Sequence, residues 1–163
     1  MVNGIRQFGI TKGMISRAVV KFHAPPDPHP FVTCFHFPGT FLTHRYVLDM
    51  VRLRLKDVPT ASGRVNGIQF IDRNTLHGTQ GMDNRWLVSL ASREAVQVLM
   101  DGGLRLFNRN IVVKAYDEIL RQEYKEYVAY EEALKKLYAT SHVVEPIDRS
   151  TEPEEGNAET SSG

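Results

Sequence analysis

The chain has 163 residues, of which 42% are hydrophobic and 24% are charged, and its formal net charge at pH 7 is +1. This size suits one ordinary domain with tails, and this hydrophobic fraction is enough for a packed core. No apolar run approaches the roughly 18 residues that span a bilayer, and a single cysteine, Cys34, excludes an internal disulfide or a cysteine-based zinc site. We therefore expect no membrane contact and a reducing compartment, the nucleus or the cytoplasm.

The net charge hides an asymmetry between the body and the tail of the chain. Residues 141–163 contain six acids and one base, whereas residues 1–140 contain 19 bases and 13 acids. The tail is rich in Glu, Ser, Thr and Gly and has few groups to bury, so it is predicted to be disordered. A mildly basic body favours nucleic acid, although an excess of this size is also common in proteins that bind none.

Residues 1–30 are interpreted as an N-terminal extension. Ser16 to His23 alternates between apolar and polar side chains, which predicts a short strand. The run 25–30 contains four prolines, and proline fixes φ and removes a backbone donor. This run is therefore predicted to be a stiff connector, with the domain proper starting at Phe31.

The first strand of the domain is predicted over Phe31–Phe37 and is ended by Pro38-Gly39. Thr43 is placed to cap a helix that continues to about Lys56. The helical spacing of Val47, Leu48, Val51 and Leu55 turns three basic side chains outward: Arg45, Arg52 and Lys56. These three are candidates for phosphate contact, although a solvated helix face is the favoured interpretation of them.

Two further strands are predicted over Val65–Ile71 and Arg85–Leu90, separated by a polar loop over residues 72–84. Alternation in the third strand sends Trp86, Val88 and Leu90 toward the core, so Trp86 is interpreted as a packing residue. Phe70 and Cys34 are also expected to face the core.

A second helix is predicted to begin after Ser92, with Ala95, Val98 and Leu99 on its inner stripe. A glycine of the Gly102-Gly103 pair is expected to end it in the left-handed conformation. A hairpin then follows over residues 104–107 and 110–116.

Residues 117–140 are predicted to form an amphipathic helix. Its apolar stripe consists of Leu120, Tyr124, Tyr127, Val128, Leu134 and Tyr138. Two alternatives stay open: the helix folds back across the sheet, or it is offered to a protein partner.

The order β–α–β–β–α–β over about residues 31–116 resembles the RNA recognition motif. The resemblance rests on the 32–37 strand followed by Pro38, on the 83–90 strand entering a helix, and on the glycine exit with its hairpin. It implies an α+β sandwich, RRM/ferredoxin-like, with an antiparallel sheet in the order 4-1-3-2. To this are added the helix 117–140 and the tail 141–163.

The stacking aromatics of that family are mostly missing here, so the motifs are degenerate. The family's three aromatic positions match Thr33, Arg85 and Leu87. The resemblance implies weak binding of single-stranded RNA through the open sheet face, because aromatic platforms each contribute about 1–3 kcal/mol. The predicted RNA-binding residues are Thr33, Phe35, Arg85, Leu87, Lys114 and Tyr116.

Three functions are weighed against one another. The leading hypothesis is a non-enzymatic RNA-binding or ribonucleoprotein subunit. The alternative is a protein-interaction adaptor that uses the sheet face or the helix 117–140 without contacting RNA. An enzyme on a ferredoxin-like scaffold has no catalytic motif behind it, and the six scattered histidines lack metal-ligand spacing, so no metal or cofactor is expected.

Overall fold

The computed structural model describes residues 20–141. The chain divides into two compact units, 1–130 and 131–163. The first half of the predicted strand from Ser16 to His23 lies outside the described residues, and its described half, from Val20 onward, is not a strand. The predicted disordered tail 141–163 also falls outside them, except for Ser141, which is helical.

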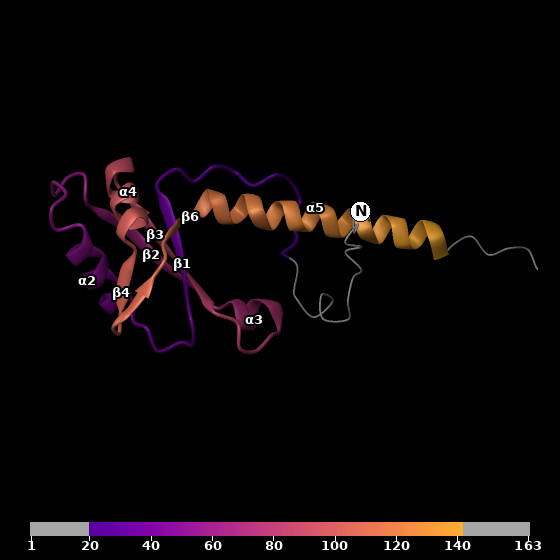
Figure 1. The fold of residues 1–163 in the computed structure, drawn as a ribbon, viewed down its shortest axis with the longest axis horizontal. Coiled ribbons are helices and arrows are strands. Elements are labelled where there is room, and N and C mark those ends of the chain that lie inside the picture. Colours follow the sequence, from indigo (N-terminus) through magenta and orange to yellow (C-terminus); the bar gives the residue numbers. More distant parts are fainter. Residues whose placement is uncertain (1–19, 142–163) are drawn as a thin grey trace, which may run out of the picture. The chain divides into compact units, whose positions relative to one another are not determined.

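The described chain alternates strands and helices in the predicted order (Figure 1). The elements are β1 (Val32–Phe37), α2 (His44–Arg54), β2 (Val65–Ile71), α3 (Arg73–His77), β3 (Asn84–Leu90), α4 (Arg93–Gly102), β4 (Leu104–Leu106), β5 (Arg109–Ile111), β6 (Lys114–Ala115) and α5 (Tyr116–Ser141). The short α3 lies in a segment that is predicted to be a loop. This helical turn is stabilised by the Asp72 carboxylate, which accepts a hydrogen bond from the Thr75 backbone N–H at 3.0 Å.

Four strands form an antiparallel sheet in the order β2-β3-β1-β6. With β6 as the fourth strand, this is the predicted order 4-1-3-2, and β1 is an interior strand as expected. The predicted last hairpin is divided: β4 and β5 pair with each other in a separate two-stranded sheet, and β6 alone joins β1. The fold is therefore α+β with an antiparallel sheet and a C-terminal helix.

Helix ends follow the signals in the sequence. The Thr43 hydroxyl accepts from the Tyr46 backbone N–H at 3.1 Å, and the Ser92 hydroxyl accepts from that of Ala95 at the same distance. Gly103 ends α4 with a φ of 64°, and a Cβ there would lie 2.4 Å from the Ile111 carbonyl oxygen. Only glycine satisfies both conditions.

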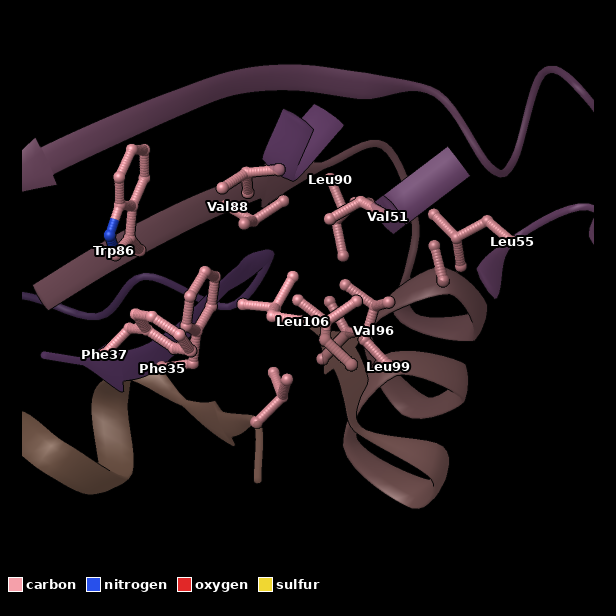
Figure 2. Close-up of a cluster of buried hydrophobic side chains, with 14 of the residues drawn as sticks. Phe35, Phe37, Val51, Leu55, Trp86, Val88, Leu90, Val96, Leu99 and Leu106 are labelled. Atoms are coloured by element: carbon pink, nitrogen blue, oxygen red, sulfur yellow. The ribbon is translucent and has the colours of Figure 1, made fainter. Parts of the chain in front are cut away.

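The core lies between the sheet and the helices α2 and α4 (Figure 2). Trp86 is 1% exposed, and its ring centroid lies 6.2 Å from that of Phe35 and 4.9 Å from that of Phe70. The prediction that Trp86 packs in the core is confirmed, and Phe70 packs half-buried against it.

The prediction of which side chains of β1 face the core is wrong: each one points to the opposite face of the sheet. Phe35 is paired with Trp86 and Cys34 with Leu87, so Phe35 points into the core and Cys34 points to the opposite face. Paired residues share a face, and the core takes Phe35 and Phe37 because they bury more apolar surface than Cys34 and His36 do.

Candidate functional site

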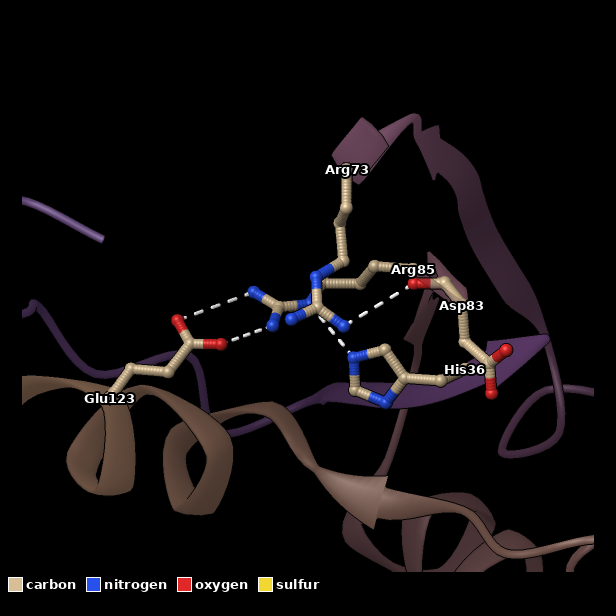
Figure 3. A network of polar contacts seen from close by, with 5 residues as sticks. All are labelled: His36, Arg73, Asp83, Arg85 and Glu123. Carbon is tan, nitrogen blue, oxygen red and sulfur yellow. Dashed lines mark hydrogen bonds and ion pairs between the residues drawn. The ribbon is translucent and has the colours of Figure 1, made fainter. Parts of the chain in front are cut away.

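The sheet face opposite the core is not open to solvent. Cys34 is 1% exposed, while Arg85 and Leu87 are each 7% exposed. Glu123 of α5 reaches Arg85 on this face (Figure 3), and Leu120, three residues earlier on the same helix, is buried. An RNA base therefore has no access to the centre of the sheet in this arrangement.

A polar network on this covered face joins β3 to α5 (Figure 3). Both terminal nitrogens of Arg85 donate to the Glu123 carboxylate, one of them at 3.4 Å, and the Arg85 Nε donates to His36 Nε2 at 3.2 Å. Arg73 lies beside them and donates to the Asp83 carbonyl oxygen at 3.3 Å. A two-pronged pair of this kind satisfies the guanidinium inside the protein, so its charge is not offered to a phosphate.

Burial governs protonation in this network. It lowers the pKa of His36 to about 4, with further lowering by the neighbouring Arg85 and Arg73 charges, so the imidazole is neutral and can accept the Arg85 hydrogen bond. Burial likewise raises the pKa of the Cys34 thiol to about 11, which keeps it protonated and unreactive near pH 7. For Arg85, burial acts to lower the pKa, but the hydrogen-bonded Glu123 carboxylate outweighs it, and the pKa is raised.

The segment ahead of β1 also contacts α5. The Phe22 ring lies edge-on to that of Tyr124 at 5.5 Å and tilted to that of Tyr127 at 5.9 Å. The His29 backbone N–H donates to the Asp117 carboxylate at 2.7 Å. Tyr124 and Tyr127 of the apolar stripe thus pack against their own chain, at the segment ahead of β1 and not at the sheet itself.

The rest of the predicted partner-binding stripe is placed differently. Val128 is 36% exposed, and Leu134 and Tyr138 belong to the second compact unit. Binding of a protein partner through these residues stays a prediction.

The prediction that six RNA-binding residues share an open sheet face is wrong in most of its members. Thr33 is fully buried and donates to the Val88 carbonyl oxygen at 3.2 Å, and Phe35 lies in the core. Arg85 and Leu87 lie on the predicted face but are covered. The two remaining residues stand at the rim of the sheet, Lys114 exposed and Tyr116 half-buried with its ring 5.3 Å from that of His29.

Glu123 is the residue of this network that sequence reasoning missed. It is one of several glutamates on the predicted helix, and it is separated from Arg85 by 38 positions. Its one sequence signal is its place three residues after Leu120 and one before Tyr124, next to the apolar stripe. Only the docking of α5 distinguishes it from its neighbours.

A second candidate site lies on the α2 side of the molecule. We call it the basic surface: Arg45, Arg52, Lys56, Arg105 and Arg109, all of them exposed. The first three share one stripe that runs along α2 and just past its end. The other two belong to the β4–β5 hairpin, which adjoins α2 because α2 packs against β4 (Figure 1). Within residues 20–141, the only ion pair made by these five cations joins Arg45 to Asp49 at 3.3 Å.

A small hollow of about 280 Å³ opens where β5, β6 and α5 meet, beside the rim of the covered face. It is lined by His36, Asn110, Ile111, Val112, Lys114 and Ile119. Among residues 20–141 there is no group of three or more histidine, cysteine or acidic side chains arranged to hold a metal ion. No helix in this range is both long and apolar enough to cross a membrane.

Residues 14–136 match the family model described as Domain of unknown function (DUF4732), and the chain belongs to this family. Among solved structures, the chain is similar to the C-terminal RNA recognition motif of the U11/U12 65K protein, with 12% sequence identity. The match covers 63% of this chain and 81% of that one, with a TM-score of 0.38. At so low a score the likeness carries no weight, and the strand order is the stronger observation.

Proposed function

We propose that this member of a family of unknown function is a non-enzymatic RNA-binding subunit that contacts single-stranded RNA through the basic surface. The observation that supports this proposal is the concentration of cations on α2 and on the adjoining β4–β5 hairpin. Residues 41–56 contain one acid and four basic side chains, three of which belong to the basic surface, and residues 104–111 contain two basic side chains and no acid. This proposal moves the RNA site from the covered sheet face to the α2 side.

The strand order supports the coarser part of the proposal. An antiparallel sheet ordered β2-β3-β1-β6, with α2 and α4 on one face, fits an RRM/ferredoxin-like fold. Fold alone does not fix function, so the proposal rests on the site. The buried Cys34 thiol fits a reducing compartment, and we place the protein in the nucleus or the cytoplasm.

The exposed cations of the basic surface determine how RNA is expected to bind. Phosphate contacts supply affinity without reading sequence, and each neutralised phosphate of a single strand contributes about 0.7 to the slope of log affinity against log salt. Engagement of all five cations of the basic surface would give a slope of roughly 3.5, and partial engagement a smaller one. The binding is therefore expected to be weak, tolerant of sequence and sensitive to salt.

The test is fluorescence anisotropy with the full chain and a labelled single-stranded RNA, measured over a series of salt concentrations. Charge reversal by Arg52→Glu with Lys56→Glu should lower the affinity at least tenfold and flatten the salt slope, because two phosphate contacts become repulsive. The melting temperature should stay nearly unchanged, since both side chains are exposed.

The matched control is Arg121→Glu with Lys125→Glu, which reverses two exposed cations at the same spacing on α5. This variant should keep the affinity close to that of the natural chain, apart from the long-range effect of net charge, which salt screens. Equal losses in both pairs would mean that net charge, not the basic surface, drives binding. No RNA binding at low salt would overturn the proposal and promote the protein-interaction adaptor.

A further inference from the structure

Exposed aromatic rings gather beside the basic surface. The ring of Phe107, in the turn between β4 and β5, lies 4.6 Å from the Tyr46 ring, nearly parallel to it, and 5.5 Å from the ring of Phe41. The rings of Phe41 and Phe107 also lie near that of Phe37, which is buried at the end of β1. Phe41 is 62% exposed and Phe107 is 50% exposed, so both present ring surface to solvent.

Phe107 keeps its place at a conformational cost. Phe107 and Asn108 form a two-residue turn in which φ is 46° and 59°, the positive values that a tight hairpin of this kind requires. Asn suits such a position, whereas a bulky side chain at positive φ is a genuine outlier. The Tyr46 hydroxyl accepts from the Phe107 backbone N–H at 3.0 Å and holds the turn in place.

The charge around these rings selects the chemistry of the ligand. The Arg109 guanidinium lies 5.4 Å from the centre of the Phe37 ring, and Arg45 is adjacent to Tyr46 in α2. Exposed rings beside cations suit a ligand with flat faces and negative charge. Unpaired bases on a phosphate backbone meet both conditions, because bases stack on aromatic rings while the phosphates contact arginine.

We propose that Phe41 and Phe107 form the base-stacking platform of this protein, which accepts unpaired bases of a single strand whose phosphates lie on the basic surface. The inference rests on the proposed function and adds to it the residues that contact the bases. It also moves base stacking from the strands of the sheet, where α5 covers the face, to the β1–α2 connection and the β4–β5 turn.

The experiment compares two RNAs of about ten nucleotides, one with normal bases and one abasic, so that the phosphates are the same. The full chain should bind the base-bearing RNA about 5- to 150-fold more tightly, which is the range for one stacked base. Phe41→Ala with Phe107→Asn should remove most of this preference while leaving the affinity for abasic RNA unchanged.

Phe107→Asn also separates ligand binding from folding. It relieves the strain at positive φ while losing the ring contact with Tyr46, and these two effects oppose each other. The melting temperature should therefore change little while the preference for bases falls. If the double variant melts early, Phe41→Ala alone serves as the second variant, since that ring is the more exposed of the two.

The matched control is Phe31→Ala. Phe31 is an aromatic side chain, 42% exposed, at the other end of β1, about 20 Å from Phe37. It should keep the full preference for base-bearing RNA. A preference lost equally in the control, or retained in the double variant, would overturn the platform.

The outcomes separate the two proposals. Equal affinity of the natural chain for both RNAs, with loss in the Arg52→Glu/Lys56→Glu variant, removes the platform and leaves RNA binding through the basic surface. An absence of binding to either RNA at low salt removes both. A preference for bases that disappears with Phe41 and Phe107 supports both.

Discussion

Two of the regions that carry arginine differ in what the side chain contacts. On the covered sheet face, Arg85 is 7% exposed and paired with Glu123 of α5. On the basic surface, Arg52 and Lys56 are exposed and make no ion pair within residues 20–141. The same charge is structural in the first region and available to a ligand in the second, so the neighbours of a cation decide its role.

The two regions also differ in what their charges cost. Removing Arg85 and Glu123 from water costs several kcal/mol per ion, and the pair offsets this only because its geometry is two-pronged and His36 accepts a further hydrogen bond. Such a pair is weak evidence for stability, but it fixes how α5 sits on the sheet. The exposed cations carry no such cost and confer no such order.

The largest expected effect comes from removing the Arg85–Glu123 pair on the covered face. Arg85→Ala should lower the free energy of unfolding by up to about 3 kcal/mol, because it leaves the partly buried Glu123 carboxylate without its partner. The measurement is a denaturant melt. The double variant Arg85→Met with Glu123→Leu should lose much less, and a single-variant loss under about 1 kcal/mol would mean that α5 does not depend on this pair.

The second effect concerns the Cys34 thiol on the same face. Its pKa is raised from 9.0 to about 11, so its thiolate fraction near pH 8 is roughly a hundred-fold lower than that of a free thiol, and burial slows its alkylation further. Labelling should be slow in the native chain and fast in denaturant. Glu123→Ala should accelerate native labelling if α5 covers the thiol, and an unchanged rate would contradict that.

A smaller effect is the dependence of stability on pH through His36. Its pKa is about 4 in the folded chain and about 6.5 when unfolded, so between these values the unfolded chain binds more protons. The contribution of His36 to stability is therefore complete above about pH 6.5 and is lost as pH falls toward 4. Melts over this range should show a shallower slope for His36→Gln than for the natural chain; equal slopes would assign the acid sensitivity to other groups.

The smallest expected effect on stability comes from replacing exposed cations of the basic surface. Arg52→Ala with Lys56→Ala on the basic surface should change the free energy of unfolding by less than about 0.5 kcal/mol per site, since exposed cations without partners hold nothing in place. The same variant should weaken RNA binding in anisotropy. A large loss of stability here would show that these side chains are structural, like Arg85.

Local signals in the sequence were sufficient for most of the fold. Thr43 and Ser92 mark the starts of α2 and α4, Gly103 marks an end, and the period-2 alternation of β3 sends Trp86 to the core. Each of these depends on near neighbours in the chain, where hydrogen-bonding and spacing rules apply directly. The short α3 was missed because a single turn has too few residues for a helical period.

The orientation of β1 was the point where local reasoning failed. Val32, Cys34 and His36 alternate with Thr33, Phe35 and Phe37, and both sets contain apolar side chains, so the pattern alone does not say which set faces the helices. Pairing with β3 decides it, because Phe35 stands opposite Trp86. A shift of one residue then exchanges every side chain between the faces.

By itself, the sequence determined most of the elements, their order and the core side of β3, because caps, periodicity and glycine act over a few residues. Only the tertiary structure decided which cations are free, because the partner of Arg85 is 38 positions away and arrives on α5. The meeting of Phe41 with Phe107 was decided in the same way, since a loop and a turn far apart in the chain come together only when β1, α2 and the hairpin pack. Charge and ring content are properties of residues, but their availability to a ligand is set by burial, which the whole fold determines.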